Sequence, residues 1–149
     1  MVDYLGRIDN GLIIEPPKII LPWSLRKREL FDKINSVQIV SENYYTIKVV
    51  LSGISFINKL GLHFEKDKLS AIDLFNDEKY SADSKIDNIF SNHQLILEDF
   101  FGPPSRNKLL DRIKDICKEY RWRFRYVTII HSLWDRFGVE ENLKIVINR

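Results

Sequence analysis

Three histidines are the side chains of this sequence best suited to proton transfer or metal binding: His63, His93 and His131. No pair of them has the His-x-His or His-x3-His spacing that places two ring nitrogens on one metal ion. An acid–base site would have to assemble from distant segments, with Asp135 as its carboxylate. We keep such an enzyme as a third hypothesis, and we expect no metal site and no cofactor.

The other reactive residue types point to structural roles. Cys117 is the only cysteine, which excludes an internal disulfide, and it continues the apolar stripe of a predicted helix. Glu140 and Glu141 fall in an expected hairpin loop, where solvated charge is the simplest interpretation. The six glycines occur singly, without a phosphate-binding motif such as Gly-x-Gly-x-x-Gly. The sequence therefore predicts no catalytic residue.

Arginines alternate with aromatic residues in the segment 120–134, which we interpret as one strand leading into a hairpin. Arg121, Arg123 and Arg125 then lie on one side, and the side chains between them lie on the other. Because a strand rises about 3.3 Å per residue, the guanidinium groups would stand about 7 Å apart in a row. We expect the aromatic rings to pack beneath helices and the arginines to face outward, where they could contact an anionic partner.

Aromatic side chains that we expect at the surface add to this candidate interface. Tyr44 and Tyr45 begin a β-rich segment of the predicted meander, and Phe137 lies in the turn of the terminal hairpin. Aromatic residues and arginine dominate the energetics of protein interfaces. The predicted partner-binding residues are Arg121, Arg123, Arg125, Tyr44, Tyr45 and Phe137.

The elements that must position these residues indicate an α+β domain. We expect an antiparallel sheet, made of a meander and a terminal hairpin, with about three helices packed on one face. The apolar spacing and the turn residues predict a hairpin around Asn10-Gly11, a helix over 24–34, a meander over 37–75, helices over 84–100 and 105–117, and a hairpin over 120–147.

Length and composition fit one globular domain spanning residues 1–149. The chain is 44% apolar, which is enough for a core, and its 23 basic and 21 acidic side chains give a net charge of only +2. That charge does not by itself indicate nucleic-acid binding. We see no basic leader followed by an apolar run, and no apolar run near the roughly 20 residues that a membrane span needs. We therefore expect a cytoplasmic protein.

The general plan from about residue 40 onward resembles small single-domain bacterial immunity proteins of polymorphic-toxin and contact-dependent inhibition systems. The resemblance is carried by the meander that contains Leu62–Leu74, the break Phe101-Gly-Pro-Pro104 and the hairpin with Trp134-Asp-Arg-Phe-Gly138. It implies a compact domain that binds and neutralises one cognate toxin, without catalysis. The leading hypothesis is therefore a protein-binding domain with a protein partner and no membrane partner. The alternative is a weak nucleic-acid-binding protein that uses the arginine row.

Overall fold

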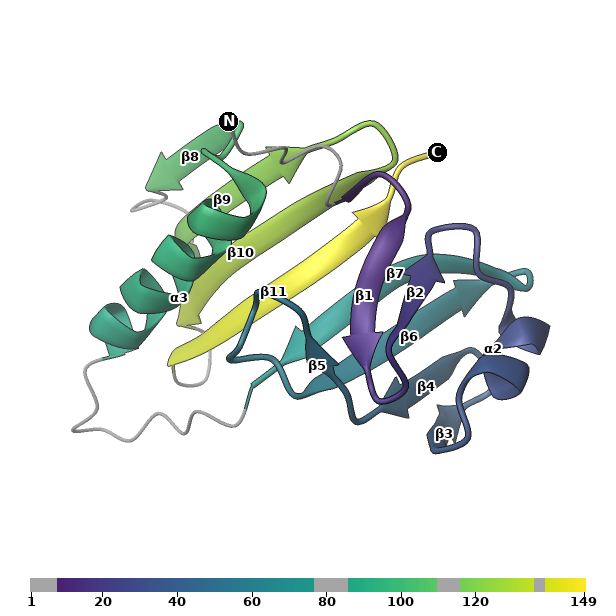
Figure 1. The fold of residues 1–149 in the computed structure, drawn as a ribbon. Coiled ribbons are helices and arrows are strands. Elements are labelled where there is room, and N and C mark those ends of the chain that lie inside the picture. Colours follow the sequence, from purple (N-terminus) through teal and green to yellow (C-terminus); the bar gives the residue numbers. More distant parts are fainter. Residues whose placement is uncertain (1–7, 77–85, 110–115, 136–138) are drawn as a thin grey trace.

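The computed structural model describes residues 8–76, 86–109, 116–135 and 139–149, and these form an α+β fold with two antiparallel sheets (Figure 1). The larger sheet has eight strands in the order β3-β4-β6-β7-β11-β10-β9-β8. Its strands are β3 (Val37–Ser41), β4 (Tyr44–Ile47), β6 (Lys59–Glu65), β7 (Lys68–Phe75), β8 (Arg106–Leu109), β9 (Ile116–Arg123), β10 (Val127–Asp135) and β11 (Val139–Ile147). The smaller sheet has the order β2-β1-β5, with strands β1 (Gly11–Glu15), β2 (Ile19–Pro22) and β5 (Val50–Leu51).

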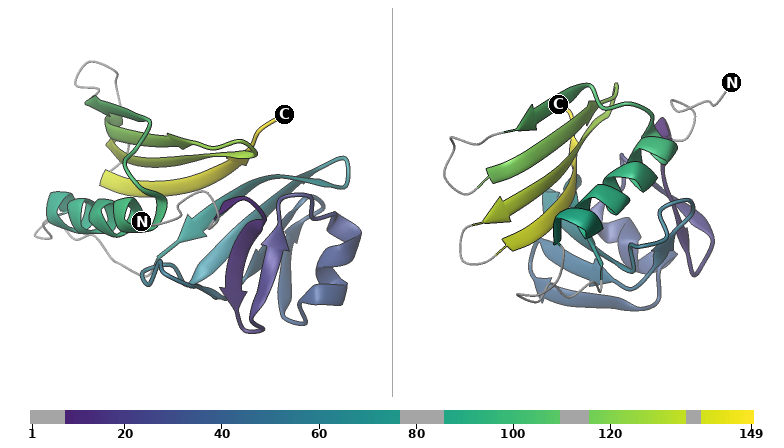
Figure 2. Two further views of the ribbon diagram at one scale, coloured as in Figure 1. Left: turned by 45° about the horizontal axis from the view of Figure 1, so that its top comes forward. Right: turned by 90° about the vertical axis from the view of Figure 1, so that its left-hand side faces the viewer.

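Two helices occur in the described part of the chain, α2 (Lys27–Lys33) and α3 (Ile86–Phe101). α3 and the smaller sheet lie against the same face of the large sheet, α3 beside β9–β11 and the smaller sheet beside β6 and β7 (Figures 1 and 2). The core lies between these layers and draws on both sheets and on α3. We call the opposite side of the large sheet the open face, because no described helix or strand covers it over β9–β11 and β7.

The register of the large sheet explains which side chains reach the core. Leu62, Ile72, Ile145, Ile129 and Trp122 are successive partners across five strands, and each is at most 1% exposed. Because side chains alternate between the faces of a strand, the neighbouring residues of each strand point to the open face. The α+β class and the antiparallel strand pairing predicted from period-2 patterning are thus confirmed. The expectation of a single sheet is wrong, because Val50–Leu51 of the predicted meander pairs with β1 in the smaller sheet.

The end of α3 agrees with its sequence signals. The helix ends at Phe101, and Gly102 follows with a φ of +87°, the left-handed conformation that glycine adopts readily after a helix. Pro103 and Pro104 then prevent the helix from continuing.

The third predicted helix, over 105–117, is wrong. Arg106–Leu109 forms β8, which pairs with β9, and β9 begins at Ile116; residues 110–115 lie outside the described ranges. Short apolar groups spaced three and four residues apart fit a helix, but sheet pairing overrides that local preference. Cys117 therefore lies on a strand and not on a helix.

The first hairpin is also placed differently from the prediction. β1 pairs with β2, so the connection runs through Pro16-Pro17-Lys18 and not through Asn10-Gly11. A loop position tolerates proline because no ladder hydrogen bond needs its missing N–H group. The predicted helix over 24–34 is present but shorter, over Lys27–Lys33. No helix among the described ranges is long and apolar enough to cross a membrane.

Candidate functional site

The predicted row of three arginines is interrupted by a turn. β9 ends at Arg123, and the chain reverses through 124–126 into β10, with the Phe124 amide donating to the Val127 carbonyl oxygen at 2.9 Å. Arg121 and Arg123 keep the two-residue spacing of one strand face. Arg125 instead lies in the turn, exposed, with its guanidinium 5.1 Å from the ring centroid of Tyr126. The prediction of one continuous strand with three aligned guanidinium groups is therefore wrong.

The open face carries a groove of about 650 Å³ over β7, β11, β10 and β9. One line of cross-strand partners runs through it from Asp73 to Lys144, Ile130 and Arg121. Trp134, Glu119 and Glu140 are among the other lining residues. The groove therefore contains acidic, basic and apolar side chains close together.

Two of the groove's larger side chains are held by neighbours on their own strands. Arg121 donates from Nε to Glu119 Oε2 at 2.9 Å and from Nη2 to Oε1 at 3.4 Å. Trp134 donates from its indole nitrogen to Ser132 Oγ at 2.6 Å. These contacts hold both side chains in defined positions before any partner arrives, which lowers the entropy lost on binding.

Tyr44 belongs to a second cluster on the open face, next to the groove. Its ring stacks on His63 with centroids 4.3 Å apart, and Asp73 accepts hydrogen bonds from His63 Nε2 at 2.6 Å and from the Tyr44 hydroxyl at 3.5 Å. Burial, followed by the charge of Asp73 and the hydrogen bond to it, raises the pKa of the Tyr44 hydroxyl. Gly61 lies directly beneath this hydroxyl, and a Cβ atom there would clash with it.

The expected exposure of Tyr45 is wrong. This residue is 6% exposed, and its ring makes edge contacts with Phe31 and Phe64. Its hydroxyl donates to the Glu42 carbonyl oxygen at 2.8 Å. Tyr44 and Tyr45 are adjacent on β4, so only one of them faces outward. Phe137, the remaining predicted aromatic residue, lies outside the described ranges.

A buried polar cluster between α3 and the sheet was missed from the sequence. The carboxylate of Glu141 is 2.8 and 2.9 Å from His93 Nδ1 and 2.6 Å from His131 Nε2. Asn76 also donates to it, at 3.2 Å, and Gln94 lies 2.7 Å from the other nitrogen of His131. The Glu141 side chain is 2% exposed, so the prediction that it is solvated is wrong. The sequence did carry a signal for this burial: Glu141, Leu143 and Ile145 are spaced by two residues, which places all three on the core face of one strand.

Aromatic rings seal this cluster from solvent. Phe56 stacks on His93 with centroids 3.8 Å apart, and Phe90 stacks on His131 at 4.0 Å. The two histidine side chains are 4% and 0% exposed. The cluster joins α3 to β10 and β11, and the Glu141 side chain between the two rings is 2% exposed.

The histidines do not converge on one site. His63 is on the open face with Asp73, whereas His93 and His131 are on the core face, and the Asp135 side chain is outside what the structure describes. Among the described residues, no group of three or more histidine, cysteine or acidic side chains is arranged to hold a metal ion.

The free energy of unfolding is expected to fall as the pH drops below the ordinary histidine value of 6.5, because burial lowers the pKa of His131 despite the opposing contacts with Glu141. Between the two pKa values the unfolded chain binds more protons, so acid favours unfolding, by at most about 1.4 kcal/mol per pH unit. Urea titrations between pH 5 and 8 measure this slope. His131→Gln should flatten it, and an unchanged slope in that variant would contradict the assignment.

Comparison with known proteins finds no family model, no curated protein and no solved structure that matches this chain.

Proposed function

We propose that this chain is a non-catalytic protein-binding domain, of the immunity-protein kind, whose partner docks on the open face. The observation that carries the proposal is the open-face groove with its two pre-positioned anchors, Trp134 and Arg121. Tryptophan and arginine are the residue types most enriched at the energetic centres of protein interfaces. A cognate toxin that inserts side chains between these anchors would be bound and blocked.

The charges of the groove favour a protein over nucleic acid as the partner. Asp73, Glu119 and Glu140 line it together with Arg121 and Lys144. A polyanion gains from several adjacent cations and is repelled by carboxylates among them. A protein surface can match both signs, and such matching governs partner choice and the rate of association.

The burial of the His–Glu–His cluster in the described part of the chain favours binding over catalysis. A catalytic group must reach the reacting atoms of a substrate, and the side chains of His93, His131 and Glu141 are at most 4% exposed. His63 and Asp73 are accessible, and we propose that they contact the partner together with Tyr44.

Substitutions in the groove test this function. The partner to use is the purified product of the neighbouring gene. Trp134→Ala and Arg121→Glu are each expected to weaken its binding by about 30-fold or more, which corresponds to the roughly 2 kcal/mol typical of an interface anchor. Isothermal titration calorimetry measures the dissociation constants.

Arg28→Glu is the matched control, because Arg28 is an exposed arginine on α2 away from the groove. It should leave the affinity within about twofold of the original. Equal losses in Arg28→Glu and Arg121→Glu would contradict docking on the open face. Tight binding of single-stranded or duplex oligonucleotides, falling steeply with added salt, would favour the nucleic-acid alternative instead.

A further inference from the structure

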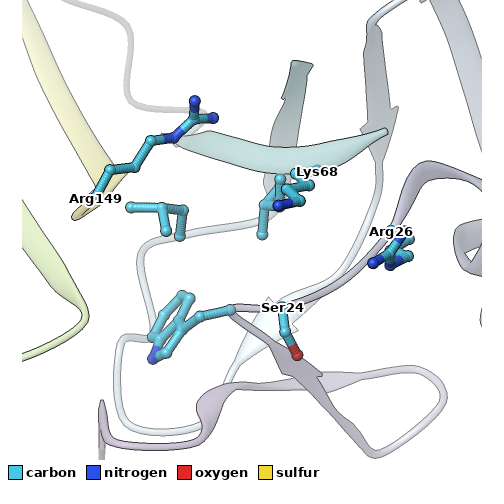
Figure 3. Close-up of a pocket in the computed structure, with 7 residues that line it drawn as sticks. Ser24, Arg26, Lys68 and Arg149 are labelled. Carbon is cyan, nitrogen blue, oxygen red and sulfur yellow. The ribbon is translucent and has the colours of Figure 1, made fainter. Parts of the chain in front are cut away.

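A second concave site lies where three segments distant in the sequence meet. Residues 23–26, the start of β7 and the segment from the end of β11 to Arg149 line a pocket of about 560 Å³ (Figure 3). Trp23, Leu69 and Ile147 supply its apolar surface. It shares no lining residue with the open-face groove.

Of the described residues, three cationic side chains and no acidic side chain line this pocket. The cations are Arg26, Lys68 and Arg149, and Ser24 adds a hydroxyl group. Figure 3 shows these four residues on separate segments of the chain around one space. A pocket of this volume is within the range that small-molecule sites occupy.

The backbone holds two of these cations directly opposite one another. Arg26 and Lys68 are antiparallel bridge partners, and the Leu69 amide donates to the Leu25 carbonyl oxygen at 3.1 Å. Lys27 and Asp67 add a further backbone hydrogen bond, at 3.0 Å. Like charges at opposed positions of an antiparallel pair destabilise it. An anion bound between Arg26 and Lys68 would attract both, so that the total electrostatic interaction at this position becomes favourable.

The nearest acidic side chains neutralise this charge only in part. Asp67 is 3.7 Å from Arg26 and also 3.7 Å from Arg28, so it serves two guanidinium groups. Glu65 is 3.4 Å from Arg149. Lys68 has no ion-pair partner within 4.0 Å in the part of the chain that the structure describes. A net positive charge therefore remains at the pocket.

We propose that this pocket binds a small organic phosphate: an anionic head held by Arg26 and Lys68, and an apolar body against Trp23, Leu69 and Ile147. Guanidinium and ammonium groups are the usual ligands for phosphate oxygens. An inorganic ion would leave the apolar surface without a contact, and a pocket of about 560 Å³ suits one small ligand better than an extended nucleic-acid backbone. The proposal is independent of the function assigned to the open face.

Phenyl phosphate is the probe, titrated at low ionic strength into the full chain and followed by calorimetry and by the indole N–H signals in NMR. We expect binding at least tenfold tighter than for inorganic phosphate, and none for phenol. Lys68→Gln and Arg26→Gln should each weaken phenyl phosphate binding about tenfold. Arg28→Gln is the matched control, because it contacts the same Asp67 from outside the pocket, and it should change affinity by less than twofold.

Lys68→Gln also gives a readout without ligand. Removing one of two opposed cations should raise the melting temperature of the free protein, although it weakens the binding of phenyl phosphate. Equal affinity for phenyl phosphate and inorganic phosphate, or equal losses in Arg26→Gln and Arg28→Gln, would overturn the proposal. Failure of phenyl phosphate to bind, with oligonucleotides binding instead, would overturn it as well.

Discussion

Glu141→Ala is expected to lower the free energy of unfolding by about 3 kcal/mol or more. The substitution removes the acceptor shared by His93 and His131, and both rings would stay buried with a nitrogen unsatisfied. Each buried polar group left without a hydrogen-bond partner typically costs about 1–3 kcal/mol, and the substitution leaves one on each of the two histidine rings. Guanidinium chloride titrations monitored by circular dichroism measure the change.

Glu140 provides the control for this prediction. It is adjacent in the sequence but exposed, because it lies on the other face of β11. Glu140→Ala should change stability by no more than about 0.5 kcal/mol. Similar effects of the two substitutions would mean that the Glu141 carboxylate does not join α3 to the sheet.

Trp122→Ala is expected to lower the free energy of unfolding by about 3–5 kcal/mol, the range seen when a large aromatic residue is removed from a core. Trp122 is 1% exposed, and its ring lies 5.9 Å from that of Phe101. Its indole nitrogen donates to the Gly102 carbonyl oxygen at 2.8 Å. The substitution therefore opens a cavity and also removes the hydrogen bond that connects β9 to the end of α3.

Two further variants serve as comparisons: the first separates the effect of ring volume from that of the hydrogen bond, and the second compares the two faces of the sheet. Trp122→Phe keeps part of the ring volume and loses the hydrogen bond, so its effect should be smaller than that of Trp122→Ala. Trp134→Ala, on the open face, should cost clearly less, because its ring is only partly buried. If Trp134→Ala were as destabilising as Trp122→Ala, the assignment of the two faces would be wrong.

The arginine segment shows why the open face could be only partly predicted. Alternation correctly placed Trp122 inside and Arg121 and Arg123 outside, because period-2 spacing is a local property of a strand. Beyond the turn it failed: it put Trp134 on the same side as Trp122, whereas Trp134 lies on the open face with Arg121. The turn at 124–126 has no local signal, since Phe124, Arg125 and Tyr126 are not typical turn residues. Asn148, which is distant in the sequence, stabilises this turn with two hydrogen bonds. Its side-chain Nδ2 donates to the Phe124 carbonyl oxygen at 2.9 Å, and its backbone N–H donates to the Tyr126 carbonyl oxygen at 2.8 Å.

The pocket lined by Arg26 and Lys68 and the buried His–Glu–His cluster depend on contacts between residues still farther apart in the sequence. Arg26 meets Lys68 only because a backbone bridge joins them, and His93 meets Glu141 across 48 residues of sequence. Each of these residues alone resembles an ordinary surface or core side chain. Nothing in the local spacing indicates which of them share a space.

Local patterns in the sequence were sufficient for the α+β class, the antiparallel meander, the helix that ends before Gly102 and the inward position of Trp122. These features follow from periodicity and backbone preference, which act over a few residues. Three features became visible only in the tertiary structure: the pairing of residues 106–109 as a strand, the position of the turn in the arginine segment, and the identity of the charged residues that become neighbours. Such outcomes depend on contacts between distant segments, and hydrogen bonding across the sheet outweighs local preferences of a few tenths of a kcal/mol per residue.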